Sequence, residues 1–447
     1  MSAIRPALER RQVLAPVLCT LIAGIAGVAV GISPHAALGL SAIAAIGALG
    51  LACASPAGIR FLLTALILST FVTRFKFDVL GFHFRPENGL VLAAAVALVA
   101  SSRSSHRLGA AARRAPVALL GLYVVWTGIV SAFIPPQPRA SLAITGWLAL
   151  DWLTLCVLVA GFTSADEIEE MGTKWACVAF AVADLLYFVG PRLGYGVQKE
   201  TVTGANAAYG LSYEANILGS TAAIWLFLAI SSPKGLSTWS RRLILPLGLF
   251  ALIVSFTRAA DVALAAGLAV WALLEGYRAR RVLVRRLGPM LVAATLLLAA
   301  IPSIGGPVLS KLTQVASVQS STGAVRVAAS AQALGDLAHF NWVVGLGANS
   351  FGQRHTDATL PGQDVSGYLG VLPLELLYGE GVIGIACLCV AFLAIRPWRL
   401  KRPARALGLV VVYVVASLAT SPFWFASSWL IIALALLAER APTPSHA

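Results

Sequence analysis

Charged side chains are scarce in this sequence. Asp, Glu, Lys and Arg supply 12% of the 447 residues, whereas hydrophobic residues supply 58% and the mean hydropathy is +0.83. Because a soluble globular protein of ordinary composition carries about 25% charged residues, this composition excludes that class. We therefore interpret the chain as a polytopic membrane protein.

Metal-binding cysteine patterns are also missing. The six cysteines lie in or beside apolar runs, without metal-ligand spacing to histidine, and we interpret them as small buried hydrophobes. Internal repeats and interdomain linkers are missing too. We expect a single transmembrane domain over residues 1–440, which includes a loop near 303–370, and a short cytoplasmic tail over 441–447.

Long apolar runs, in contrast, recur along the whole chain. About fourteen are long enough to cross roughly 30 Å of hydrocarbon as helices. They cover about residues 13–32, 36–54, 57–73, 88–101, 115–134, 141–162, 174–190, 215–232, 242–256, 259–275, 287–302, 371–395, 406–421 and 423–438. The pattern predicts an all-α bundle of about 14 transmembrane helices, within a range of 12–14, embedded in a lipid bilayer.

The basic residues define an orientation for this bundle. They outnumber the acidic residues by 33 to 19, which gives a net charge of +14. Most fall in alternate loops, for example within 103–114, 278–286 and 396–405, as the positive-inside rule requires. The excess is therefore topological, and we exclude a nucleic-acid partner. With an even number of spans, both termini are cytoplasmic.

Polar chemistry is then concentrated in the loops on the outer side. The stretch near 303–370 is the longest of these, and loops of that length in a compact domain are usually functional. Within it, residues 325–340 have the spacing of a membrane-surface helix, and residues 345–352 form a glycine-rich turn. We expect a partly helical loop on the outer face.

Arginine predominates among the outer cations. Arg258 lies in a turn, Ser255 to Asp261, closely flanked by apolar runs, so its charge sits at the membrane boundary and requires a partner or a function. The planar guanidinium suits bidentate binding of phosphate. Arg258 and Arg326 are our candidates for a pyrophosphate site, with Arg85 in support. The alternative is that outer arginines reach to lipid phosphates.

Two residues are candidates for a general base. Glu214 begins the run at 215–232, where a helix dipole stabilises its anion; simple helix capping is the alternative. His355 lies beside Arg354 and close to Asp357, and a histidine of near-neutral pKa can accept a proton from a hydroxyl nucleophile. The alternative for His355 is a solvated loop histidine.

A series of short patterns resembles the O-antigen ligase and O-antigen polymerase superfamily of bacterial envelope polysaccharide glycosyltransferases. The patterns occur in the order found in that superfamily, over roughly residues 80–395. They are Phe84 to Asn88, Tyr209 to Asn216, Ser255 to Arg258, Arg326 with Ala333 and Leu334, Gly345 to Phe351, and Gly381 to Gly384.

The sequence departs from the ligase pattern at two positions. Ligases of this superfamily typically carry a histidine eleven residues before the first glycine of the closing pattern, where this chain has Gly370. Val262 stands where a leucine usually follows the turn arginine. The resemblance therefore leaves both an O-antigen ligase-like enzyme and a polysaccharide polymerase open.

The resemblance implies an enzyme that moves a glycan from a polyprenyl-pyrophosphate carrier to a hydroxyl of a glycan or glycolipid acceptor. It places the active site on the periplasmic side of the bacterial inner membrane. Arg258, Arg326 and Arg85 would stabilise the departing pyrophosphate, and Glu214 or His355 would act as the base. The outer face has no acidic metal cluster, so we predict metal-independent catalysis without a cofactor.

Two other classes stay open. A secondary transporter or flippase would place ionisable residues within its spans, and Asp151, Asp184 and Glu375 lie inside apolar stretches. The third class is a non-catalytic membrane scaffold.

Overall fold

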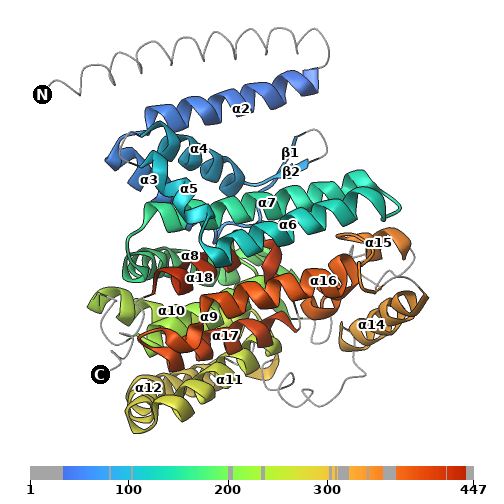
Figure 1. The fold of residues 1–447 in the computed structure, drawn as a ribbon. Helices are drawn as coiled ribbons and strands as arrows, with labels where there is room; N and C mark the ends of the chain where they lie inside the picture. The colour runs from blue at the N-terminus through green and yellow to red at the C-terminus, as the bar shows by residue number, and fades with distance from the viewer. Residues whose placement is uncertain are drawn as a thin grey trace, which may run out of the picture.

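The chain forms a helical bundle with two short β-hairpins (Figure 1). The computed structural model describes residues 34–79, 82–101, 104–199, 205–232, 237–301, 305–307, 310, 322–339, 342–355, 369–418 and 420–438. The helices are α2 (Pro34–Ala52), α3 (Pro56–Ser69), α4 (Pro86–Ala100), α5 (Ser105–Ala112), α6 (Ala115–Phe133), α7 (Pro138–Gly161), α8 (Ala165–Leu193), α9 (Ala215–Ser231), α10 (Thr238–Val254), α11 (Arg258–Glu275), α12 (Tyr277–Ala300), α14 (Thr322–His339), α15 (Ser350–Arg354), α16 (Leu372–Ile395), α17 (Pro403–Ser417) and α18 (Ala426–Leu437). Two 3₁₀ turns, η1 (Pro397–Arg399) and η2 (Pro422–Trp424), flank α17.

The helical architecture predicted from the sequence is confirmed. Among the described residues, four helical stretches are long and apolar enough to cross a membrane: Ala115–Phe133, Pro138–Gly161, Ala165–Leu193 and Leu372–Arg399. The predicted runs from 36–54 to 423–438 also coincide with helices, but several of these are shorter, such as the 17 residues of α9. The run at 13–32 lies outside the described residues.

The sequence did not predict the two hairpins. The strands β1 (Phe77–Val79) and β2 (Phe82–Phe84) pair antiparallel, as do β3 (Val197–Lys199) and β4 (Asn206–Ala208). Both hairpins fall in loops between predicted apolar runs, the first between 57–73 and 88–101 and the second between 174–190 and 215–232. β1 and β2 lie at the same end of the bundle as α14 and α15 (Figure 1).

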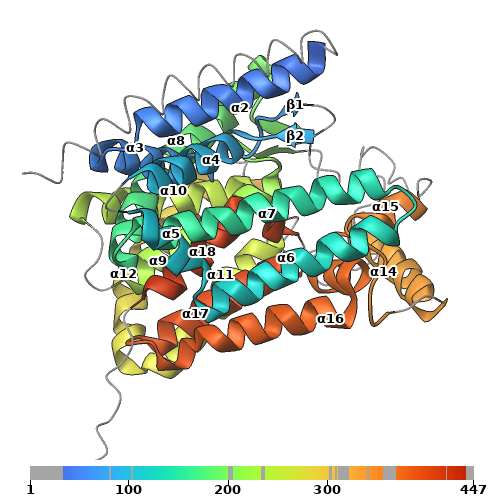
Figure 2. The ribbon, with the colours of Figure 1, turned by 45° about the horizontal axis from the view of Figure 1, so that its top comes forward.

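Helix α9 lies at the centre of the bundle. Almost every residue from Ala215 to Ser231 is buried, as expected for a helix that is apolar on all sides. It packs against α10, α11 and α17. On the other side of the molecule, α6 lies between α7 and α16 (Figure 2). Because the middle of α9 is buried, what distinguishes its two ends is the set of residues around its first and last turns.

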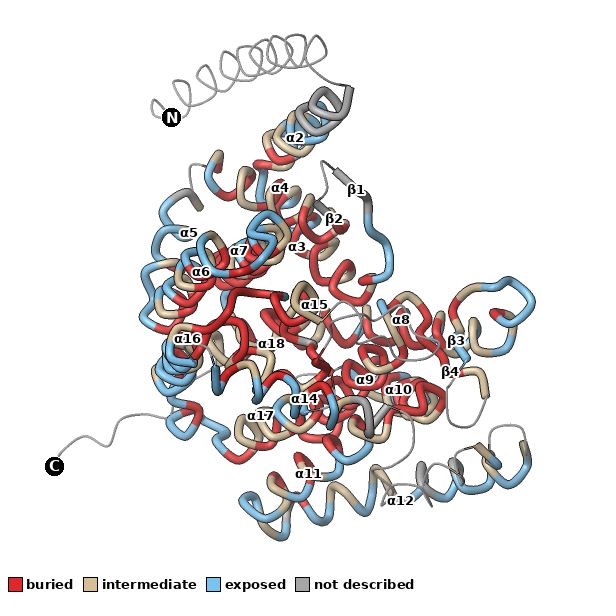
Figure 3. The backbone as a smooth tube through the Cα atoms, turned by 90° about the vertical axis from the view of Figure 1, so that its right-hand side faces the viewer, coloured by how far each residue is buried: buried red, intermediate tan, exposed pale blue. Residues whose placement is uncertain are grey.

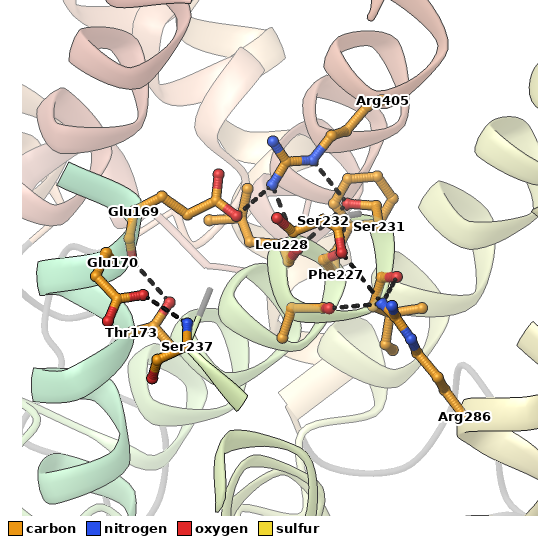
Figure 4. Close-up of polar contacts among 12 residues, drawn as sticks. Glu169, Glu170, Thr173, Phe227, Leu228, Ser231, Ser232, Ser237, Arg286 and Arg405 are labelled. Atoms are coloured by element: carbon orange, nitrogen blue, oxygen red, sulfur yellow. Dashed lines mark hydrogen bonds and ion pairs between the residues drawn. The ribbon is translucent and has the colours of Figure 1, made fainter. Parts of the chain in front are cut away.

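Two arginines bind the carboxyl end of α9 (Figure 4). Arg286 of α12 donates from Nη1 to the carbonyl oxygens of Ala229 at 3.1 Å and Ile230 at 2.6 Å. Arg405 of α17 donates from Nη2 to the carbonyl oxygen of Leu228 at 3.3 Å. Arg286 binds carbonyls of the last turn, and Arg405 shares the Leu228 carbonyl with the Ser232 amide, at the end where the helix dipole favours cations.

Arg405 also forms a buried ion pair. Its Nη2 lies 2.6 Å from Oε1 of Glu169 on α8, and the two side chains are 15% and 2% exposed. Its Nε donates to the hydroxyl of Ser231 at 3.0 Å. From the sequence, the positive-inside rule alone accounts for Arg286 and Arg405. In the structure they also hold α8, α9, α12 and α17 together.

The two glycine patterns near 345 and 381 form one unit. Gly381 has a φ of +67° and breaks the helical geometry inside α16. The break leaves backbone carbonyls of α16 available for other donors, and amides of the 342–347 turn donate hydrogen bonds to them. The amides of Leu346 and Gly347 donate to the carbonyls of Tyr378 at 2.7 Å and Gly379 at 2.8 Å. The turn is thus fastened to α16 at its kink.

A methyl group at position 381 would disrupt this junction. A Cβ at Gly381 would lie 2.4 Å from the carbonyl oxygen of Val343, and a positive φ alone costs a non-glycine residue about 1–3 kcal/mol. We expect Gly381→Ala to lower the thermal unfolding temperature and to speed hydrogen exchange over 342–347. Gly335→Ala is the control, since a Cβ there meets nothing within 4 Å. Equal exchange in the two variants would contradict the assignment.

A small separate core lies beneath this junction. Ala333 and Leu337 of α14 pack with Leu346, Phe351 and Tyr378, apart from the main core of the bundle. The described part of the predicted 303–370 loop is therefore helical in part and rests on the first half of α16.

Candidate active site at the amino end of α9

Glu214 is the residue that immediately precedes α9. Its backbone is extended, with φ −151° and ψ 168°, so it occupies the N-cap position as predicted. Its side chain does not cap the helix. Instead, the carboxylate bonds to the Asn216 side chain, accepts a long hydrogen bond of 3.5 Å from the Thr420 hydroxyl, and interacts with the charge of Arg326. Glu214 therefore faces residues from distant parts of the chain.

Burial raises the pKa of the Glu214 carboxyl above its usual value. The hydrogen bond with Asn216, the positive charge of Arg326 and the Thr420 hydroxyl act in the opposite direction but do not cancel it. A carboxyl whose pKa is moved towards the operating pH is better suited to accept a proton from a substrate.

The segment before α9 is held by the end of α3. The guanidinium of Arg74 donates to the carbonyl oxygen of Tyr213 at 2.8 Å and lies 4.7 Å from the ring centroid of Tyr209. The Tyr213 amide donates to the hydroxyl of Thr73 at 2.8 Å. These contacts fix the backbone on which Glu214 stands. No sequence pattern assigned a role to Arg74.

The Arg258 turn rests on the first turns of α9. The Thr257 hydroxyl donates to the carbonyl of Ala215 at 3.1 Å, and a Cβ at Gly219 would lie 2.7 Å from the Ser255 hydroxyl. Phe256 between them has a φ of +51°, rare for a bulky residue and often found near functional sites. Arg258 is thus the first residue of α11, next to the amino end of α9.

Arg326 reaches the same place from α14. This residue is partly exposed, and its charge acts on Glu214, which lies over 100 residues earlier in the chain. Figure 3 looks onto this end of the bundle, with α14 beside the ends of α9 and α17. Three of the predicted site positions, Glu214, Arg326 and the Arg258 turn, therefore meet at the amino end of α9.

Arg85 occupies an aromatic box nearby. Its guanidinium lies 4.5 Å from the ring of Phe425 and 4.8 Å from the ring of Trp147, and it is 3.8 Å from a carboxylate oxygen of Glu87. It also donates to the carbonyl of Trp424 at 3.3 Å. Arg85 is largely buried, and its donors are already directed at groups of the protein.

The segment from Thr420 to Phe425 connects Arg85 with Glu214. Thr420 binds Glu214, and the Trp424 carbonyl binds Arg85. Glu375 of α16 also holds this segment, because it accepts hydrogen bonds from the Ser421 hydroxyl and from Trp424 Nε1. No sequence pattern predicted that this segment belongs to a site. The one feature that marks it in the sequence is the polar and proline break between the apolar runs at 406–421 and 423–438.

His355 lies elsewhere. Its Nε2 is 2.6 Å from Oδ2 of Asp336 on α14, and the same oxygen accepts a 2.5 Å hydrogen bond from the Tyr378 hydroxyl. Asp336 stands ten positions after Arg326, about 15 Å further along the helix at 1.5 Å per residue. The structure thus groups His355 with the α14–α16 junction and separates it from Arg326. Asp357 lies outside the described residues.

The Asp336 cluster predicts a pH dependence. Burial opposes ionisation of Asp336, but hydrogen bonds from Tyr378 and His355 and the charges of His355 and Arg354 outweigh it and lower its pKa. The folded-state pKa of Asp336 lies below the unfolded value of about 3.9, so the ionised carboxylate stabilises the fold at pH values above about 4. This stabilisation is lost as the pH falls through the folded-state pKa.

We therefore expect hydrogen exchange in α14, corrected for intrinsic rates, to stay slow at neutral pH and to accelerate only below about pH 4. Asp336→Asn should exchange faster already at pH 7. Gln332→Ala, an exposed change on the same helix, serves as the control. Slow exchange in Asp336→Asn at pH 7 would show that the cluster does not hold α14.

In the described part of the chain, no group of three His, Cys, Asp or Glu residues is placed to hold a metal ion. The fold is that of a helical protein in which, among the described residues, four helical stretches are long and apolar enough to cross a membrane. An acid and basic residues lie near one helix end. Comparison with protein-family models, with curated proteins and with solved structures finds no significant match.

Proposed function

We propose that this protein is a membrane glycosyltransferase that moves a glycan from a polyprenyl-pyrophosphate carrier to an acceptor hydroxyl. In this proposal about 14 helices cross the bacterial inner membrane, both termini are cytoplasmic, and the α14 end of the bundle faces the periplasm. The observation that carries the proposal is the meeting of Glu214, Arg326 and the Arg258 turn at the amino end of α9.

This arrangement suits a diphosphate leaving group. A helix amino end presents unpaired amides and a partial positive charge. Arg258, the first residue of α11, and Arg326 of α14 add full positive charges near it. When the bond from the anomeric carbon to the diphosphate oxygen breaks, negative charge develops on that oxygen, and such charges stabilise it most in the transition state.

Glu214 is the base in this mechanism. The acceptor hydroxyl attacks the anomeric carbon, its proton passes to the Glu214 carboxylate, and the carrier diphosphate departs. Arg326 lowers the proton affinity of Glu214 in the free protein. A diphosphate that engages Arg326 neutralises that effect, so donor binding makes Glu214 a stronger base. Glu214 is preferred to His355 because it lies beside Arg326.

A secondary transporter or flippase is the second candidate function. The specific observation in its favour is Glu380, which is 1% exposed and has no hydrogen-bond partner for either carboxylate oxygen among the described residues. Buried ionisable groups of this kind occur along proton and substrate pathways.

The test is mass spectrometry of surface glycans and lipid-linked intermediates in a deletion strain. The enzyme proposal predicts loss of one surface glycan and accumulation of its polyprenyl-pyrophosphate precursor. The accumulated precursor is then supplied to the purified protein in liposomes without an ion gradient. Formation of a new glycosidic bond supports the enzyme. Passage of the intact precursor across the bilayer without bond formation supports the transporter.

A further inference from the structure

A long groove lies between helices that follow one another in the chain. α16 packs against α6, whereas α17 packs against α11 and α9, so the two diverge after η1. Together with α18 they enclose a cavity of about 370 Å³. Its walls are mostly apolar, with side chains such as Leu376, Leu409 and Ile432 contributed by the three helices.

The groove runs through the depth of the hydrocarbon layer. Its lining on α16 extends from Leu372 to Ile395, the two ends of that helix. A helix of 24 residues spans about 36 Å, compared with roughly 30 Å of hydrocarbon. A flexible hydrocarbon chain therefore matches the chemistry of the groove, and an acyl chain fits within its length.

Charged residues line only one mouth of the groove. This mouth, at the carboxyl end of α9, carries Lys401, Arg402, Arg405, Asp166 and Glu169. Arg405 and Glu169 neutralise each other in their 2.6 Å ion pair. Lys401, Arg402 and Asp166 then leave this mouth with a net positive charge beside the apolar channel.

The position of these charges selects one occupant. None of the three proposed pyrophosphate arginines, Arg85, Arg258 and Arg326, lines the groove. A donor lipid bound there would have its diphosphate near the apolar Leu372 and Phe423, or else at the end opposite the candidate active site. A lipid whose anionic headgroup lies at the Lys401 mouth meets complementary charge.

We propose that the groove between α16, α17 and α18 is a binding site for one anionic phospholipid. Its acyl chain lies along the groove, and its phosphate contacts Lys401 and Arg402. Basic residues next to a membrane attract anionic headgroups in this way. The headgroup contacts are independent of the proposed glycosyl transfer, because Lys401 and Arg402 lie at the other end of the bundle, although the apolar end of the groove reaches Phe423 in the segment next to Glu214.

Native mass spectrometry of the purified full-length protein tests the headgroup contact. The probes are phosphatidylglycerol and phosphatidylcholine with the same acyl chains. Wild type should retain phosphatidylglycerol about tenfold over phosphatidylcholine. The double variant Lys401→Ala, Arg402→Ala should lose that preference, and Arg399→Ala, an exposed neighbour outside the groove, should keep it. An unchanged preference in the double variant would overturn the site.

A second variant tests the groove itself. Ala435→Trp fills the channel from α18 and should abolish retention of both lipids, whereas Val390→Trp, on the exposed face of α16, should not. Equal retention in the two tryptophan variants would place the lipid elsewhere. Displacement of phosphatidylglycerol by an equal concentration of a synthetic polyprenyl diphosphate would assign the groove to the donor and refute the phospholipid.

Discussion

We expect Arg326→Ala to lower the proposed glycosyl transfer at least about tenfold while the protein stays folded in the membrane. The loss corresponds to about 1.4 kcal/mol of transition-state stabilisation, a modest amount for a cation that contacts a departing diphosphate. Arg326→Lys restores only part of the rate, because an ammonium cannot reproduce a bidentate contact. The measurement is turnover of the accumulated precursor by purified variants in liposomes.

The matched control is Arg192→Ala. Arg192 is an exposed arginine in the last turn of α8, in one of the segments assigned to the outer side, and it shares no contact with Glu214. An arginine that merely reaches to lipid phosphates would behave the same at either position. Equal rates for wild type, Arg192→Ala and Arg326→Ala would therefore remove Arg326 from the site.

The interaction between Arg326 and Glu214 makes the two mutations non-additive. Glu214→Gln removes the proposed base. In that background Arg326 can still stabilise the diphosphate but can no longer modulate the base, so the further loss from Arg326→Ala is smaller. Residues that act as a unit show this behaviour. Fully additive losses would mean that the two side chains act independently, against the coupling of donor binding to base strength.

The sequence predicted local features well and remote partners poorly. Glu214 was placed correctly before a helix because an apolar run begins one residue later. A turn between two helices was also placed correctly at 255–257, although Arg258 itself is the first residue of α11. Both are consequences of short-range pattern. That the charge of Arg326 would act on Glu214 depends on where α14 packs, and no local spacing encodes that.

His355 illustrates the same limit. The sequence offered Arg354 and Asp357 as neighbours, whereas the structure pairs the imidazole with Asp336, nineteen residues earlier. Burial and long-range docking select such partners. In the same way, no local pattern pairs Glu169 with Arg405, because Arg405 lies 236 residues further on.

That buried pair carries the largest stability effect we expect. Glu169→Ala leaves the guanidinium of Arg405 in a mostly buried position without its counter-ion. Removing one partner of a buried ion pair costs about 3–5 kcal/mol, because the remaining charge is neither hydrated nor paired. The bonds from Arg405 to Ser231 and Leu228 retain part of its hydrogen bonding but supply no negative charge.

Two comparisons separate this charge effect from loss of packing. Lys174→Ala breaks the exposed Lys174–Glu170 pair, whose side chains are 61% and 25% exposed, and should change stability by less than about 1 kcal/mol. The double variant Glu169→Leu, Arg405→Met removes both charges and should recover much of the loss, since buried pairs are often replaceable by apolar residues. Denaturant unfolding in detergent micelles measures all three. If Glu169→Ala were no less stable than Lys174→Ala, the pair would not hold α8 to α17, and the carboxyl end of α9 would owe its order to Arg286 alone.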